Sequence, residues 1–433
     1  MPTHTTRTAL ASTIAVGLST LSLAACSAGA PSSAGATSAG TSSTSSPAAS
    51  TVATTSATTG AATTSPTTSP TTGTTRTPSA TSSGPATPTG APPTSTPGRA
   101  TGTATVVRTL ATGIDVPWGL ARLPDGTVLV SARDSFRVYR LDVAAARLGR
   151  VGTVPGVVSN VAQQGEAGLL GIAVSPTFPR DHLVYAYYST AGDNRIAAIP
   201  WDPSAPAGRQ LRTPRVLVRG IPHNVHHNGG RIAFGPDGYL YATTGEAQQP
   251  ALAQDKGSLG GKILRMTTAG RPAPGNPFGT LVWSYGHRNV QGIAWDAAGR
   301  LWASEFGDHS EDELNLIRPG RNYGWPQTEG RTSRAGITGP VAQWGPPEDS
   351  PSGIAIAQGS VWMAALRGQR LWRIPLDGSA TAATPQDFLV GRYGRLRSVL
   401  AVGPDTLLVT TSNRDGRQSP GAGDDRILLV RVT

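Results

Sequence analysis

The sequence predicts an all-β fold, a six-bladed β-propeller with four antiparallel strands per blade, from two observations. First, one hairpin-like phrase recurs six times after residue 103, beginning at Trp118, Leu170, Gly230, Gln291, Ser352 and Arg397. Each copy is an apolar run, a turn rich in Gly, Pro and Asp, and a second apolar run, which is typical of two strands joined by a tight turn. Second, successive copies begin roughly 45–60 residues apart, a spacing typical of propeller blades.

Two further strands are expected in each unit. A third run follows every hairpin: FRVYRLD, RIAAIPWD, GKILRMT, ELNLIRPG, QRLWRIPLDG and DRILLVRV. A fourth β-prone stretch precedes hairpins, as in TATVVRTL, PRVLVRGI and GTLVWSYG. The stretch Thr103–Leu110 comes before the first hairpin, whereas the chain ends on a third-strand run. We therefore expect the N-terminal strand to complete the last blade and close the ring. The alternative is a β-sandwich whose hairpins are similar by accident.

Residues 1–26 are predicted to be an export signal. A weakly basic start precedes an apolar stretch, and small residues surround Cys26. The sequence Leu-Ala-Ala-Cys at residues 23–26 resembles a bacterial lipobox, in which the cysteine is lipidated and becomes the mature N-terminus. Cys26 is the only cysteine of the chain, so an internal disulfide is excluded. The alternatives are an ordinary cleaved signal peptide or a short membrane anchor.

Residues 27–102 form a second segment, composed almost entirely of Ser, Thr, Ala, Pro and Gly. A stretch with so few apolar side chains is expected to stay disordered, because it cannot bury a core. The predicted organisation is thus a signal with lipobox (1–26), a low-complexity linker (27–102) and the propeller (103–433). A cell-surface or periplasmic lipoprotein, anchored to the membrane through Cys26, is the expected location.

The charge of the chain limits its partners. The formal net charge is +11, and residues 103–433 carry +8 of it, because Arg7, Arg76 and Arg99 precede them. No basic run is present, so a nucleic-acid partner is not expected. An acidic cofactor or an anionic surface is the better class of partner.

The chemically unusual residues fall on loops that share one face of a propeller. In each blade, the loop entering the first strand and the loop leaving the second lie at the same end of the central channel. Entering loops contain Glu166, His226, His227, His287, Arg288, Asn289, Arg395 and Arg397. Leaving loops contain Glu246, Gly307, Asp308, Arg367 and Arg414. The opposite face receives plain turns of the Pro-Asp-Gly type, so a site is predicted at one end only.

These residue types favour a particular chemistry. Guanidinium groups from three blades suit a planar polyanion, because their forks pair with carboxylates and their planes stack on rings; they are Arg288, Arg367, Arg395 and Arg397. His227 with Glu246 offers a base and a carboxylate that orients it. Gly307 and Asp308 lie in a loop rich in oxygen ligands, which suits calcium.

At these residues the chain resembles the glucose/sorbosone dehydrogenase family, quinoproteins that use pyrroloquinoline quinone (PQQ). The resemblance covers about Val106 to Val432. Its strongest stretches are WSYGHRNVQGIAW and ASEFGDHSEDELNLIRPGRNYGWP, and further segments such as GEAGLLGIAVSPTF and HHNGGRIAFGPDGYLYATTGE follow the family order.

The resemblance implies roles for individual residues. The catalytic set would be His227 as base, Glu246 as its orienting acid, and Arg288. The cofactor would contact Arg288, Asn289, Arg367, Arg395 and Arg397, with Arg367 standing where soluble glucose dehydrogenases have Lys. The sugar would lie near Glu166 and His226. Main-chain oxygens of Gly307 and Asp308 would bind the cofactor's calcium, although the family often has Pro at the second position. Glu313 and the carbonyl of Tyr323 would bind a second, structural calcium.

The implied function is PQQ- and Ca²⁺-dependent oxidation of the anomeric hydroxyl of aldoses to lactones, with electrons leaving to an external acceptor. The paired histidines resemble the broader aldose-type branch more than the strict glucose enzymes. Two alternatives stay open: a non-catalytic propeller that binds sugars or a protein, and a calcium-dependent lactonase.

Overall fold

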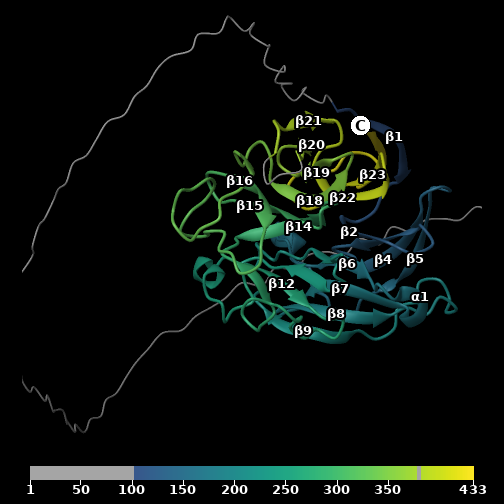
Figure 1. Cartoon of the computed structure of the whole chain (residues 1–433). Coiled ribbons are helices and arrows are strands. Elements are labelled where there is room, and N and C mark those ends of the chain that lie inside the picture. Colours follow the sequence, from purple (N-terminus) through teal and green to yellow (C-terminus); the bar gives the residue numbers. More distant parts are fainter. Residues whose placement is uncertain (1–101, 378–381) are drawn as a thin grey trace, which may run out of the picture. The chain divides into compact units, whose positions relative to one another are not determined.

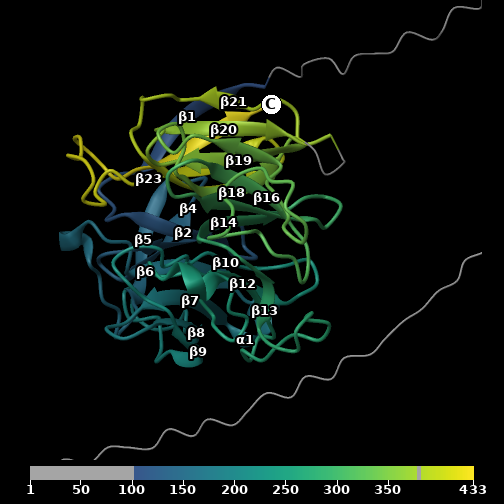
Figure 2. The ribbon, with the colours of Figure 1, turned by 90° about the vertical axis from the view of Figure 1, so that its left-hand side faces the viewer.

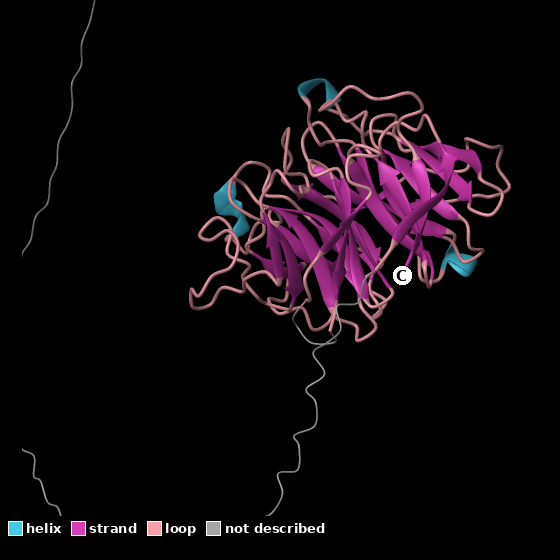
Figure 3. Ribbon diagram, turned by 90° about the horizontal axis from the view of Figure 1, so that it is seen from above, coloured by secondary structure: helices cyan, strands magenta, loops and turns pink. Residues whose placement is uncertain are grey.

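The computed structural model describes residues 102–377 and 382–433, and these form 24 strands arranged in six four-stranded sheets (Figure 1). The all-β prediction is confirmed. In the described residues helix is limited to α1 (Phe178–Asp181) and two short 3₁₀ turns (Figure 3). The predicted signal, lipobox and linker lie outside the described residues. None of the helices in the described part is long and apolar enough to cross a membrane.

The first three blades follow one another along the chain, each strand pairing antiparallel with the next. Blade 1 comprises β2 (Pro117–Arg122), β3 (Val128–Ala132), β4 (Arg137–Asp142) and β5 (Arg147–Thr153). Blade 2 comprises β6 (Leu169–Val174), β7 (Leu183–Ser189), β8 (Asn194–Pro200) and β9 (Arg215–Ile221). Blade 3 comprises β10 (Ile232–Phe234), β11 (Leu240–Thr243), β12 (Lys262–Met266) and β13 (Val282–Tyr285).

The remaining blades complete the ring. Blade 4 comprises β14 (Asn289–Trp295), β15 (Leu301–Phe306), β16 (Asp312–Ile317) and β17 (Ala342–Trp344). Blade 5 comprises β18 (Pro351–Ala357), β19 (Ser360–Ala365), β20 (Arg370–Pro375) and β21 (Gln386–Phe388), which stack in order in Figure 2. Blade 6 comprises β22 (Leu396–Gly403), β23 (Thr406–Thr411), β24 (Ile427–Val432) and β1 (Ala104–Ala111).

The ring closes as the sequence predicts. Strand β1 is the outermost strand of blade 6 and pairs with β24, so that Ala104 opposes Val432 and Ala111 opposes Ile427. The first strand therefore lies beside the C-terminal strand (Figure 1). Because the closing pairs join residues more than 300 positions apart, they hold the two ends of the folded part together.

The hydrophobic core is divided among the blade interfaces. Six clusters of buried side chains are present in the described residues, and each lies between two neighbouring blades. The cluster between blades 4 and 5, for example, joins Trp302 and Leu314 to Val361 and Ile374. Strands such as β12 and β19 are buried at every position, because each sheet packs against a neighbouring blade on both of its faces.

One position shared by the six hairpin repeats is explained by packing at the channel wall, where the innermost strands of neighbouring blades approach closely. In four copies one position is glycine: Gly119, Gly171, Gly292 and Gly353. A Cβ at Gly171 would lie 2.2 Å from the carbonyl oxygen of Gly230, so a larger residue would clash with backbone. The other two copies have Arg231 and Ser398, and Arg231 Nη2 donates to Ser398 Oγ at 3.0 Å. These two residues belong to opposite blades, so they connect the ring across its axis.

Candidate active site

A cavity of about 290 Å³ lies where the loops of the predicted functional face converge. Six of the residues predicted from the sequence line it: Glu166, His226, His227, Arg367, Arg395 and Arg397. Five residues that the sequence prediction did not include also line it: Gln291, Phe306, Ser350, Leu366 and Arg417. The expected convergence of side chains from separate blades is therefore present in the structure.

His227 is held in one orientation by a carboxylate. Its Nδ1 lies 2.5 Å from Glu246 Oε1, and the Glu246 side chain is almost completely buried. His227 has a left-handed backbone conformation (φ 59°), which is uncommon for a residue with a Cβ and is found at functional sites. The ring tautomer that donates Nδ1–H to Glu246 has its lone pair on Nε2. This arrangement provides an oriented general base.

Glu166 is the central acceptor of the cavity. Its Oε2 accepts from the backbone N–H of His227 at 3.0 Å and from Asn289 Nδ2 at 3.2 Å. Its Oε1 lies 3.4 Å from Arg417 Nη2. Burial alone would raise the pKa of Glu166, but Arg417 and the neighbouring histidines outweigh burial and lower it to about 2. Glu166 is therefore ionised and anchors the loop that carries the base.

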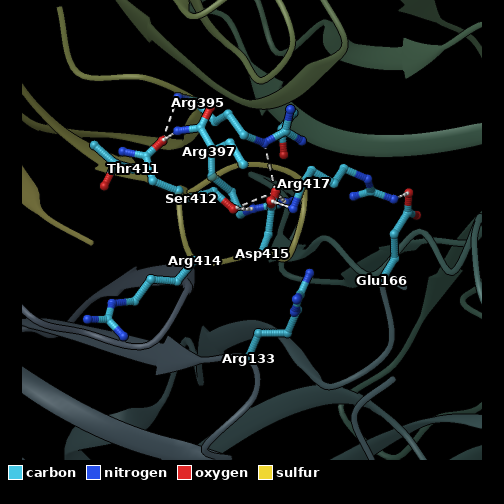
Figure 4. Close-up of polar contacts among 12 residues, drawn as sticks. Arg133, Glu166, Arg395, Arg397, Thr411, Ser412, Arg414, Asp415 and Arg417 are labelled. Atoms are coloured by element: carbon cyan, nitrogen blue, oxygen red, sulfur yellow. Dashed lines mark hydrogen bonds and ion pairs between the residues drawn. The ribbon is translucent and has the colours of Figure 1, made fainter. Parts of the chain in front are cut away.

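Arg395 and Arg397 share one buried counterion, Asp415 (Figure 4). Asp415 Oδ2 accepts from Arg395 Nε at 2.9 Å and from Arg397 Nη2 at 3.3 Å. Burial tends to raise the pKa of Asp415, and the two guanidinium groups lower it below its usual value. Burial and nearby cations also lower the pKa of Arg397 to about 9, since one carboxylate does not balance the positive charge. An anionic ligand would relieve this excess.

Two further predicted cofactor contacts, Arg288 and Asn289, are not among the residues that line the cavity. Asn289 is fully buried, where its side chain accepts from the N–H of Gly229 and donates to Glu166, so it braces the cavity wall. Arg288 does not line the cavity. Its Nη2 donates to Asp308 Oδ1 at 2.6 Å, and its guanidinium lies 5.3 Å from the centroid of Trp325.

The predicted calcium ligands occupy the β15–β16 loop, strand β16 and, for Tyr323, the β16–β17 loop. No hydrogen bond from any described residue reaches the carbonyl oxygens of Gly307 and Asp308, so both are free to bind a cation. Glu313 is buried, and burial together with nearby Glu305 raises its pKa above the usual value, which a bound cation would reverse. Within residues 102–377 and 382–433, no group of three or more His, Cys, Asp or Glu side chains is arranged to hold a metal ion. Main-chain oxygens would thus supply much of any calcium coordination.

Tyr323 is connected to Glu313 through a buried network of one ring stack and several hydrogen bonds. The Tyr323 ring stacks on His287, with centroids 4.7 Å apart. His287 Nδ1 contacts Glu305 at 2.8 Å, and Asn315 Nδ2 donates to both Glu305 and Glu313. The two predicted structural ligands therefore belong to one network.

A propeller with an oriented His–Glu pair and a buried arginine cluster in one axial cavity has the architecture of an enzyme that acts on a ligand in its channel. The sequence model of the glucose/sorbosone dehydrogenase family matches residues 114–428. This chain belongs to that family. The family and the enzyme class expected from the sequence, an oxidoreductase, are confirmed.

Similar proteins agree with this assignment. The PQQ-bound form of an aldose sugar dehydrogenase from Streptomyces coelicolor is 58% identical, with a TM-score of 0.75, over 77% of this chain and 99% of that one. The aldose sugar dehydrogenase YliI of Escherichia coli is 31% identical over 72% of this chain and 91% of its own length. The quinoprotein glucose dehydrogenase B of Acinetobacter calcoaceticus is 29% identical over 53% of this chain and 54% of its own.

Proposed function

We propose that this protein is a PQQ- and Ca²⁺-dependent aldose dehydrogenase that oxidises the anomeric hydroxyl of a sugar to a lactone. The observation that carries the proposal is the placement of the His227–Glu246 pair and the arginines 367, 395 and 397 around one cavity. Family membership and the PQQ-bound relative from Streptomyces coelicolor support the choice of cofactor.

The residues present fit PQQ. Its carboxylates would be held by Arg395 and Arg397, whose excess positive charge calls for an anion, and by Arg367 on the same cavity wall. Gln291 Oε1 already accepts from Arg397 Nη1 at 3.2 Å and fixes its orientation. When bound, PQQ would supply the acceptor of the hydride, which carries both electrons from the sugar.

The residues present also fit calcium. The free carbonyl oxygens of Gly307 and Asp308 would hold one ion near the cofactor. Glu313 and the carbonyl of Tyr323 would hold a second ion of structural importance, since a cation would stabilise the ionised form of a carboxylate that burial otherwise disfavours.

The chain's own groups would handle the proton and the developing charge. His227 Nε2 accepts the proton of the anomeric hydroxyl while C1 loses its hydrogen as hydride, so two electrons and two protons leave the sugar. Glu246 keeps the ring in place and stabilises the imidazolium that forms. Arg288, held by Asp308, would contribute positive charge toward the bound cofactor. Electrons would leave to an external acceptor.

Reconstitution tests the proposal. The purified protein is mixed with PQQ and Ca²⁺, and the cofactor spectrum and the reduction of an artificial dye are followed with a panel of aldoses. We expect saturable binding of PQQ and aldose-dependent dye reduction that His227→Asn abolishes. PQQ binding without turnover on any aldose would favour the non-catalytic propeller. Equal lactone hydrolysis with and without PQQ would favour the lactonase.

We further propose that the protein is exported and anchored to a membrane through a lipid on Cys26. The lipobox-like sequence at residues 23–26 supports this proposal. Metabolic labelling with a fatty acid in a bacterial host should mark the wild type and not Cys26→Ala. Label on both proteins, or on neither, would contradict the lipid anchor.

A further inference from the structure

The β23–β24 loop carries two charged residues that serve different parts of the cavity. Asp415 points toward Arg395 and Arg397, whereas Arg417, two positions later, extends toward Glu166 (Figure 4). The resemblance of the sequence to its family assigned no role to Arg417. Its side chain is 26% exposed and lines the cavity.

Only one nitrogen of the Arg417 guanidinium is engaged by side chains in the described residues. Nη2 lies 3.4 Å from Glu166 Oε1 and 3.3 Å from His226 Nδ1. No hydrogen bond is formed by Nε or Nη1 with any described residue, so these groups can donate to a ligand in the cavity. Burial lowers the pKa of His226 even though Glu166 lies nearby, which favours a neutral ring able to accept from Arg417.

Arg417 is also close to the base. Glu166 accepts from the N–H of His227 at 3.0 Å and contacts Arg417 through its other oxygen. One carboxylate thus separates the guanidinium from the residue that would receive the sugar's proton. Glu166 and Arg417 line the same cavity as His227, so they are the groups available to hydroxyls beside the anomeric centre of a bound sugar.

We infer that Arg417 is a substrate-binding residue, which together with Glu166 recognises two adjacent hydroxyl groups of a neutral aldose. The carboxylate accepts from one hydroxyl, and the guanidinium donates to the oxygen of the next. The Arg417 guanidinium is a donor and the Glu166 carboxylate is an acceptor, so the pair matches the two hydroxyls of a vicinal diol. Their contact with each other keeps both side chains in position. This inference rests on the proposed function. It adds the part of the substrate that is recognised and the residue responsible.

The chain offers a matched control in the same loop. Arg414 is exposed, and its Nε donates to the carbonyl of Asp424, away from Glu166 (Figure 4). Arg414→Met and Arg417→Met therefore each replace one arginine of the same loop by methionine. Only Arg417→Met changes a residue of the cavity wall.

The test measures sugar binding separately from turnover. Titration calorimetry follows 1,5-anhydro-D-glucitol, which lacks the anomeric hydroxyl, binding to the full-length protein loaded with PQQ and Ca²⁺. Steady-state kinetics with D-glucose and its 2-, 3- and 4-deoxy analogues run in parallel. In Arg417→Met we expect the analogue's Kd and the KM for glucose to rise about tenfold, the size of one lost hydrogen bond to a charged group. The kcat and the Kd for PQQ should change less than about threefold, and Arg414→Met should match the wild type.

The deoxy sugars identify the contact. The wild type should discriminate against two neighbouring deoxy analogues, and Arg417→Met should lose the discrimination against one of them. Equal sugar affinity in Arg417→Met and the wild type, or a loss of PQQ affinity in place of sugar affinity, would overturn the inference. If the wild type binds the analogue but reduces no dye, the proposed oxidation fails while Arg417 remains a sugar ligand. If it neither binds nor oxidises any sugar, both fail.

Discussion

Arg288 and Asp308 form an ion pair of 2.6 Å between two predicted site residues that lie on different loops. The pair joins the loop before β14 to the loop between β15 and β16. Asp308 Oδ2 also lies 3.1 Å from His309 Nε2, whose side chain is 90% exposed. The sequence predicted a role for the main chain of Asp308, and the structure adds one for its side chain, which positions a proposed catalytic arginine.

Replacing Asp308 with Asn should lower kcat by about tenfold, because Arg288 loses its charged partner and its fixed position, and a loss of ~1.4 kcal/mol of transition-state stabilisation gives this factor. Steady-state kinetics of the PQQ-loaded enzyme measure it. His309→Ala is the control, because the solvent-exposed ring of His309 contributes little to the positioning of Arg288. This variant should have the kcat of the wild type. An Asp308→Asn enzyme with wild-type kcat would remove Asp308 from this positioning role.

The His227–Glu246 pair should govern turnover and not cofactor binding. Glu246→Gln keeps the size of the side chain but removes the charge that stabilises imidazolium, so we expect kcat to fall by roughly 10²–10⁴. The Kd for PQQ, measured by fluorescence quenching, should stay within about twofold of the wild type. Should Glu246→Gln retain full turnover, another group must orient and activate the base.

Asp415 should stabilise the protein most when the cofactor is absent. Its removal in Asp415→Ala leaves the buried guanidinium of Arg397 without its carboxylate, which costs roughly 3–5 kcal/mol. PQQ would return negative charge to the same arginines. The thermal midpoint of Asp415→Ala should therefore rise more on addition of PQQ than the midpoint of the wild type. An equal rise in both proteins would show that PQQ does not replace this charge.

Much of this site follows from the order of strands alone. Once the repeat predicts six blades, the loops that share a face are fixed, which is why Glu166, His227 and Arg397 were expected together and do line one cavity. Arg417 and Asp415 were not found, because choosing a partner among many loop charges requires distances across the channel. The sequence pattern also does not distinguish a side chain that lines a cavity from one that braces its wall, and Asn289 illustrates this difference.

The acid side of the stability profile should depend on Glu166. Its pKa is about 2 in the folded protein against an ordinary value of 4.5, so its ionised form favours folding. The stabilisation is fully present above pH 4.5 and is lost as pH falls from 4.5 toward 2. In Glu166→Gln, the decline in the free energy of unfolding over this window should shrink by up to about 3 kcal/mol. Urea titrations at pH 3, 4.5 and 7 test this, and parallel acid profiles in both proteins would contradict it.

The closing strand gives a prediction about the fold itself. Strand β1 supplies the outer edge of blade 6, and Leu110 is buried in the cluster between blades 1 and 6. A chain that starts at residue 102 keeps β1, whereas one that starts at 112 exposes the edge of β24 and loses the closure of the ring. We expect the first truncation to unfold cooperatively near the midpoint of the full chain, and the second to be strongly destabilised or to aggregate. Circular dichroism melts and size-exclusion chromatography compare them. A stable monomer starting at residue 112, with an unchanged melting midpoint, would show that β1 does not hold the propeller closed.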